Sequence, residues 1–181
     1  MCSLKPGVKK DRNSKQRAIY LRNIMVSEGN LTGMVRQQKI TSIDLGIDLA
    51  SGQEGEYFKW FLACLLFGKP IQQEVAKRTY FEFVKEGLTT PDAILQAGWD
   101  TLVAVLDRGH YVRYDYSTAT KLLDISKALK EKYGTLTNLL RQAHSLEELS
   151  AQIEGFKGIG PKTREIFLRD IAPLVYSNHA K

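Results

Sequence analysis

The stretch EYFKWFLACLLFG, residues 56–68, is apolar on nearly every face that a helix would present. A surface helix carries polar residues along one side, so a helix that is apolar all round belongs at the centre of a protein. Around this stretch, helix-capping residues, prolines and glycines recur at short intervals, whereas the alternation typical of half-buried strands is scarce. The chain is therefore predicted to be all-α, with many short helices joined by tight connections.

Local signals give the starts of the other helices. Thr90-Pro91 is an N-cap followed by proline at the first helical position, and Ser145 with Glu148 forms an S-x-x-E capping box. The predicted helices cover residues 14–28, 70–87, 91–98, 100–107, 117–133, 136–143 and 145–154, with a last one from Pro161 onward. We expect two parts: a basic N-terminal segment over 1–53, with one helix and a polar connection that has room for a short helix, and a helical core over 54–181.

Positive charge is concentrated near the N-terminus of the 181-residue chain. Its formal net charge is +6, yet residues 1–40 hold nine Lys and Arg against two acidic residues, a balance of +7. Such a basic block suits a polyanion, and nucleic acid is the commonest polyanion inside a cell. A solvated tail is the alternative reading of the same residues.

The number of cysteines and the length of the apolar runs exclude several classes of protein. Cys2 and Cys64 are too few for a disulfide scaffold, a four-cysteine zinc site or an all-cysteine iron–sulfur cluster. The three histidines lack metal-ligand spacing, so we expect no metal site and no cofactor. No apolar run reaches the roughly 18 residues of a membrane span, and no secretory signal is evident. A reducing, intracellular location and no membrane partner are expected.

The segment FKGIGPK, residues 156–162, carries the most informative pattern. Glycines on both sides of Ile159 allow a tight turn with outward-facing amides, and Pro161 then begins a helix whose positive end favours an anion. A phosphate held in this way needs no base contact, so such a turn would hold a nucleic-acid backbone of any sequence. A plain turn between two helices is the alternative. The predicted contact residues are Lys157, Gly158, Ile159, Gly160, Lys162, Thr163 and Arg164.

This pattern resembles the helix–hairpin–helix motif, h-x-G-h-G-P-K-T, over about residues 146–172. Together with FKWFLACLLF, GKPIQQEVAKR and the helices that follow, residues 56–172 resemble the helix–hairpin–helix DNA glycosylase superfamily, which includes endonuclease III. The resemblance implies a two-lobed helical bundle that binds damaged double-stranded DNA in base-excision repair, removing a damaged base or cleaving at the abasic site. Arg164 departs from the family, which has a small residue there.

The resemblance also implies residue roles. Bifunctional members have a lysine at the place of Lys162, whose neutral amine would attack the sugar C1′ and form a Schiff base. A phosphate contact is the alternative role for this lysine. The family's catalytic aspartate would fall at Ala180, and its iron–sulfur cysteines are missing; Asp170 is expected to be a surface or capping residue. Both an enzyme and a non-catalytic module that recognises damaged or distorted DNA therefore stay open.

Two further places are candidates for contact with an opened duplex. In the loop at 109–114, His110, Tyr111 and Arg113 combine aromatic and cationic groups that suit base stacking and phosphate contact, although tyrosines that cover the core fit equally well. Gln72 and Gln73 fall near the place where many relatives insert a glutamine, but a helix start is also an ordinary surface position. Packing roles are expected for Trp60, Trp99 and Cys64.

Overall fold

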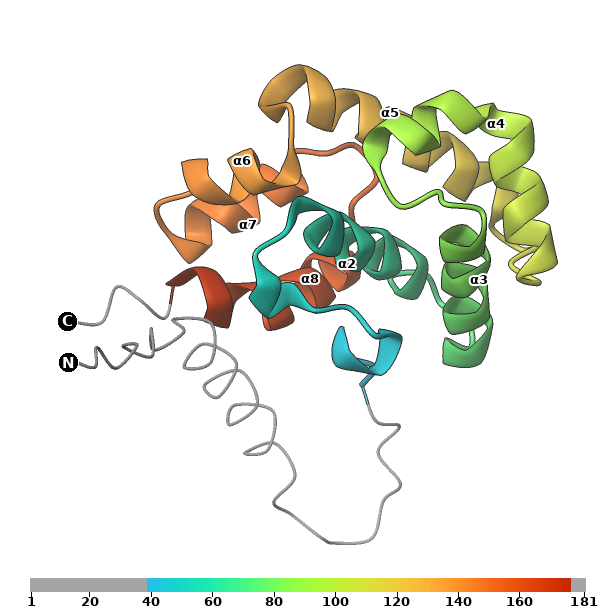
Figure 1. The fold of residues 1–181 in the computed structure, drawn as a ribbon, viewed down its shortest axis with the longest axis horizontal. Helices are drawn as coiled ribbons and strands as arrows, with labels where there is room; N and C mark the ends of the chain where they lie inside the picture. The colour runs from blue at the N-terminus through green and yellow to red at the C-terminus, as the bar shows by residue number, and fades with distance from the viewer. Residues whose placement is uncertain (1–38, 177–181) are drawn as a thin grey trace, which may run out of the picture. The chain divides into compact units, whose positions relative to one another are not determined.

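A computed structural model describes residues 39–176 of the chain (Figure 1). The predicted helix over 14–28 and most of the basic segment lie outside the described residues. Within 39–176 every regular element is helical, which confirms the all-α class. Two short 3₁₀ helices, η2 (Ile43–Leu45) and η3 (Leu49–Ser51), precede the α-helices α2 (Glu54–Phe67), α3 (Gln73–Lys85), α4 (Pro91–Arg108), α5 (Asp115–Tyr133), α6 (Leu136–Gln142), α7 (Leu146–Glu154) and α8 (Pro161–Tyr176).

Helix α2 lies in the middle of the described helices, with α3 and α4 on one side and α6 and α7 on the other (Figure 1). Trp60, Phe61 and Cys64 on this helix have no solvent exposure, so the predicted central helix and two of the packing residues are confirmed. The Trp60 indole donates a hydrogen bond to the Phe167 carbonyl at 3.4 Å, and the Phe61 and Phe167 rings are 5.3 Å apart. These contacts hold α8 against α2.

The predicted N-cap residues make their capping hydrogen bonds at the starts of α4 and α7. The Thr90 hydroxyl accepts the Ala93 amide at the start of α4, and Ser145 accepts the Glu148 amide at 3.1 Å. The Glu148 carboxylate accepts a hydrogen bond from the amide of His144 rather than from that of the cap residue. Each cap supplies an acceptor for an amide that the first helical turn cannot satisfy.

Some boundaries match the prediction and others differ. The predicted break at Gly98 is present, since its φ of +75° and ψ of 173° are non-helical and α4 consists of two helical stretches that meet there at a kink. Helix α3 begins at Gln73 rather than Pro70, and α5 begins at Asp115 rather than Ser117. Trp99 is 39% exposed instead of buried; its indole donates to Thr120 at 3.1 Å. A kink just before a tryptophan turns that side chain to the surface.

Residues 39–53 pack as part of the helical core. Leu45, Ile47 and Leu49 are buried in the same hydrophobic cluster as α2 and α8. These described residues therefore belong to the same compact unit as the helices that follow them. Three apolar side chains spaced through a polar segment are enough to hold it on the core.

Asp170 is buried, at 6% exposure, so the expectation of a surface or capping role is wrong. Its carboxylate accepts the Ser42 amide at 2.9 Å and the Arg169 guanidinium at 2.7 Å. Arg169 also donates to the Ile40 carbonyl at 2.6 Å. A buried carboxylate needs such donors, and here they join residues 40–42 to α8. No described helix is long and apolar enough to cross a membrane.

Candidate functional site

The turn at residues 155–160 joins α7 to α8 and is anchored by an aromatic side chain. Phe156 is 4% exposed, and its ring lies 6.1 Å from those of Phe61 and Tyr133. The Ile159 amide donates to the Phe156 carbonyl at 3.1 Å, and Ile159 packs partly against the core. Gly158 is exposed and has φ +92°, a conformation that disfavours any side chain. The tip of the turn is thus set by glycine, and its base by Phe156.

Amides are available where this turn meets α8. The Arg164 amide donates to the Gly160 carbonyl at 3.1 Å, which begins the helical ladder. Within the described residues, no hydrogen bond occupies the amides of Gly158, Gly160, Lys162 or Thr163. Unpaired amides and the helix dipole together produce positive potential at this end of α8.

Helix α2 ends directly against the first turn of α8. A β-carbon at Gly68 would lie 1.9 Å from the Thr163 hydroxyl oxygen, so only glycine fits there. Thr163 is 6% exposed. The prediction that its side chain contacts DNA is therefore not supported by its position, because it faces α2 instead of solvent.

Lys69, immediately after Gly68, meets a lysine from α5. The side chain of Lys69 lies near that of Lys121, so the two positive charges repel each other. A β-carbon at Gly158 would lie 2.7 Å from Cε of Lys121, so this lysine lies against the turn. Lys69 Nζ and Arg113 Cζ are 5.4 and 5.5 Å from the centre of the Tyr114 ring. We refer to Lys69, Lys121, Arg113 and Tyr114 as the basic cluster.

The basic cluster has an unusual electrostatic state. Burial, and then the neighbouring Lys69, lower the pKa of Lys121 from 10.5 to about 8. Among residues 39–176, no carboxylate forms an ion pair with Lys69, Arg113 or Lys121, although nine other Lys or Arg side chains do have such a partner. The positive charge of the cluster is therefore left uncompensated by acidic side chains.

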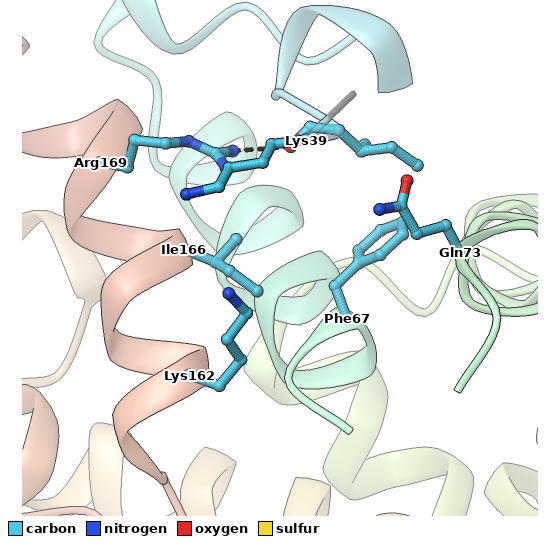
Figure 2. A pocket seen from close by; sticks show the side chains of 7 residues that line it. Lys39, Phe67, Gln73, Lys162, Ile166 and Arg169 are labelled. Atoms are coloured by element: carbon cyan, nitrogen blue, oxygen red, sulfur yellow. Dashed lines mark hydrogen bonds between the residues drawn. The ribbon is translucent and has the colours of Figure 1, made fainter. Parts of the chain in front are cut away.

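Lys162 lies on a different side of the same helix start, in a pocket of about 90 Å³. Figure 2 shows Lys162, Ile166 and Arg169 of α8 on one wall and Phe67 and Gln73 on the other. The amine of Lys162 donates to Glu165 at 3.3 Å, and its side chain is 55% exposed. The pocket is lined by Lys39, Ile40, Phe67, Gln73, Lys162, Ile166 and Arg169, a set without a carboxylate.

Glu165 is shared between two lysines at this pocket. Lys39 also donates to it at 3.3 Å. Hydrogen bonds from Lys162 and then from Lys39 hold the pKa of the Glu165 carboxyl below its ordinary value. Lys162 is accordingly a paired ammonium in this arrangement, and it would have to leave Glu165 and lose a proton before its amine could attack a carbon atom.

The remaining predicted contacts divide between surface and core. His110 and Arg113 are exposed, and His110 has φ +63°. Tyr111 is completely buried and donates its hydroxyl hydrogen to the Leu66 carbonyl at 2.6 Å, so it covers the core as the alternative reading held, and its proposed role in base stacking is corrected. Gln72 is exposed, whereas Gln73 lines the Lys162 pocket.

Two predicted cations on the hairpin also differ in their surroundings. Lys157 is exposed beside the tip of the turn. Arg164 forms an ion pair with Glu154 at the end of α7. Arg164 therefore ties α7 to α8, and its contact with DNA stays a prediction.

Sequence reasoning missed Lys69, Lys121 and Tyr114. Lys69 follows the apolar helix without any motif, and Lys121 occupies an ordinary polar position between the buried residues of α5. Their proximity follows from the packing of the end of α2 and the start of α5 around the turn. No local pattern in a single sequence could have paired them.

No family model, curated protein or solved structure matches this chain. Within residues 39–176, no three His, Cys, Asp or Glu side chains are grouped so that they could hold a metal ion. The fold class of the described residues is all-α. The features that bear on the function of the chain are the turn, the basic cluster and the Lys162 pocket.

Proposed function

We propose that this chain is an intracellular, glycosylase-like protein of base-excision repair that binds the backbone of damaged double-stranded DNA through a helix–hairpin–helix at 146–172. The observation that carries the proposal is the group of unoccupied amides at the start of α8, next to cations without carboxylate partners. Amides and cations together bind phosphate without reading bases. The proposed two-lobed arrangement would leave the Lys162 pocket between its lobes.

Lys162 is the proposed nucleophile of this activity. Once neutral, its amine would attack C1′ of the sugar, and the base would leave with the electrons of its bond and take up a proton. The C1′–O4′ bond would then open as the nitrogen loses a proton, and the resulting imine would be the Schiff base that links protein to DNA. Arg169 and Lys39 line the same pocket as Lys162. DNA binding would have to separate Lys162 from Glu165 before this reaction.

A non-catalytic module that recognises damaged or distorted DNA is the second candidate. It is favoured by the pocket, because no carboxylate lines it, and the neighbouring Glu165 is bonded to Lys162 and Lys39 instead of being placed to stabilise the cation that develops on the sugar as the base departs. Asp170 cannot serve without breaking its bonds to Ser42 and Arg169. The two candidates share the backbone contact and differ only in chemistry.

Borohydride trapping on a duplex with one abasic site separates the two candidates. An adduct that forms with the wild-type chain and disappears in Lys162→Ala supports the enzyme. Lys85→Ala is the matched control, because Lys85 also pairs with a glutamate three residues away on an exposed helix face. Lesion-selective binding on native gels without any adduct supports the binding module. If the chain forms no adduct and binds no DNA, both candidates are refuted.

Glycine substitutions test the hairpin itself. Gly158→Val should weaken DNA binding, since φ is +92° there and the new side chain would press on Lys121. Gly87→Val is the control, because Gly87 has φ +70° with open space around its β-carbon position. It imposes similar backbone strain far along the chain from the turn. Equal DNA affinity of the two folded variants would count against the hairpin assignment.

The basic segment, which lies outside the described residues, is tested separately. Deleting residues 1–17 removes six Lys and Arg together with Asp11. If this segment contacts phosphates, the dependence of the DNA affinity on salt concentration should become less steep, because fewer counterions are released on binding. An unchanged slope would identify it as a solvated tail.

A further inference from the structure

Lys69 and Lys121 place two positive charges near each other, Lys69 beside the Tyr114 ring and Lys121 against the Gly158 turn. Both side chains are partly buried, and no carboxylate in the described part of the chain compensates them. In the absence of a ligand such an arrangement is unfavourable, because two like charges are held together and partly desolvated.

Among residues 39–176, the surroundings of the pair offer hydrogen-bond donors, and no carboxylate forms an ion pair with them. Lys69 Nζ and Arg113 Cζ lie within 5.5 Å of the centre of the Tyr114 ring. On the other side, Lys121 lies against Gly158, whose amide has no hydrogen-bond acceptor within the described residues. An anion at this place could accept hydrogen bonds from both lysines and from the tip of the turn. Its negative charge would then compensate both ammonium groups.

The amount of charge distinguishes between kinds of phosphate. A phosphodiester within a strand carries one negative charge and offers two free oxygens, whereas a phosphate monoester carries about −1.5 to −2 at pH 7 and offers three. Two lysines and the Arg113 guanidinium supply up to three positive charges. We propose that the basic cluster binds a phosphate monoester, specifically the phosphate that terminates a DNA strand at a break.

This inference rests on the proposed function, because it assumes that the ligand reaches the turn as part of a DNA duplex. It adds a preference that backbone binding alone does not include. The protein would hold a nicked duplex with a terminal phosphate more tightly than the same duplex with a terminal hydroxyl. The Lys162 pocket is not part of this site.

The experiment measures the affinity of the full chain for four duplexes of identical sequence: intact, nicked with a 5′-phosphate, nicked with a 3′-phosphate, and nicked with hydroxyls only. We expect one of the phosphorylated ends to bind about tenfold more tightly than the hydroxyl nick, the size of effect given by one or two charge-assisted hydrogen bonds. In Lys69→Gln and Lys121→Gln that preference should disappear, because affinity for the phosphorylated nick falls by a larger factor than affinity for the intact and hydroxyl-nicked duplexes.

Lys127→Gln is the matched control. Lys127 is on the same helix as Lys121, and its side chain is 70% exposed, so this variant removes the same charge away from the cluster and should keep the preference. Inorganic phosphate at millimolar concentration should compete with the phosphorylated nick in the wild-type chain. Circular dichroism verifies that each variant is folded.

Failure of the terminal-phosphate site and failure of the proposed function give different results in this experiment. Equal affinity for phosphorylated and hydroxyl nicks, with DNA binding retained, overturns the terminal-phosphate site and leaves the proposed function standing. A wild-type chain that binds no DNA refutes the proposed function. In that case, a shift of the Lys69 and Lys121 side-chain NMR signals on addition of inorganic phosphate would still support a phosphate site, and no shift would overturn it.

Discussion

Replacing Lys121 with methionine should make the protein more stable at neutral pH. Methionine keeps an unbranched apolar chain over Gly158 but removes the ammonium that burial and Lys69 disfavour. In the folded protein the pKa of Lys121 is about 8, whereas in the unfolded chain it is close to 10.5. The folded state therefore binds the proton less tightly than the unfolded state, and the wild-type chain bears this cost whenever the lysine is charged.

The sign and size of this change in stability follow from the difference between the pKa of Lys121 in the folded and in the unfolded chain. A shift from 10.5 to about 8 corresponds to about 3.4 kcal/mol at 1.36 kcal/mol per pH unit. Because the side chain is only partly buried and solvent screens its charge, we expect about 1 kcal/mol. Below pH 8 the wild-type chain bears the full cost; between pH 8 and 10.5 its stability rises with pH as the folded state loses the proton first. The advantage of Lys121→Met should shrink across that window and vanish above it.

Urea denaturation at pH 7, 9 and 11 measures this difference in the free energy of unfolding. At pH 7 the variant should also melt about 3 °C higher, the shift that about 1 kcal/mol produces in a chain of this size. Lys127→Met on the same helix is the control and should change stability little, because that side chain is exposed. A Lys121→Met variant that is no more stable at pH 7, or whose advantage persists at pH 11, would refute the reasoning.

Three further substitutions test the packing around the site. Gly68→Ala should cost about 2 kcal/mol of unfolding free energy, because its methyl group would meet the Thr163 hydroxyl, and combining it with Thr163→Ala should recover part of the loss. Ser145→Ala should cost about 1 kcal/mol by removing the cap of α7, and an unchanged urea midpoint would show that the cap contributes nothing. Asp170→Ala should cost about 3 kcal/mol, since the buried acceptor of the Ser42 amide is lost; a loss below 1 kcal/mol in thermal unfolding would contradict that role.

The helices could be predicted because their signals are local. Capping by Ser145 depends on an amide three residues away, and the buried stripe of Leu122, Ile125, Leu129 and Tyr133 repeats at the helical period within one element. The break at Gly98 was also predictable, and the structure has non-helical backbone angles there, where two helical stretches meet at a kink. Boundaries were less predictable: Pro70 precedes α3 by a short turn, because a proline can stand before a helix as well as open it.

The candidate site could be predicted only in part. The position of the turn follows from the two glycines and Pro161. Lys162 lines a pocket, and its role as a nucleophile stays a prediction. The orientation of Tyr111 and the burial of Asp170 did not follow, because each depends on a partner far along the chain. Leu66 accepts the hydrogen bond of Tyr111, and Ser42 donates to Asp170.

By itself, the sequence determined the all-α class, the central place of residues 56–68 and the turn before α8, since each depends on side-chain patterns within a few residues. The tertiary structure alone decided that Lys69 and Lys121 meet beside Gly158, that Thr163 faces Gly68 and that Lys162 pairs with Glu165 at a pocket wall. These contacts arise where the ends of α2, α5 and α8 converge. Convergence depends on how whole helices pack, and packing is set by contacts between residues that are distant in the chain.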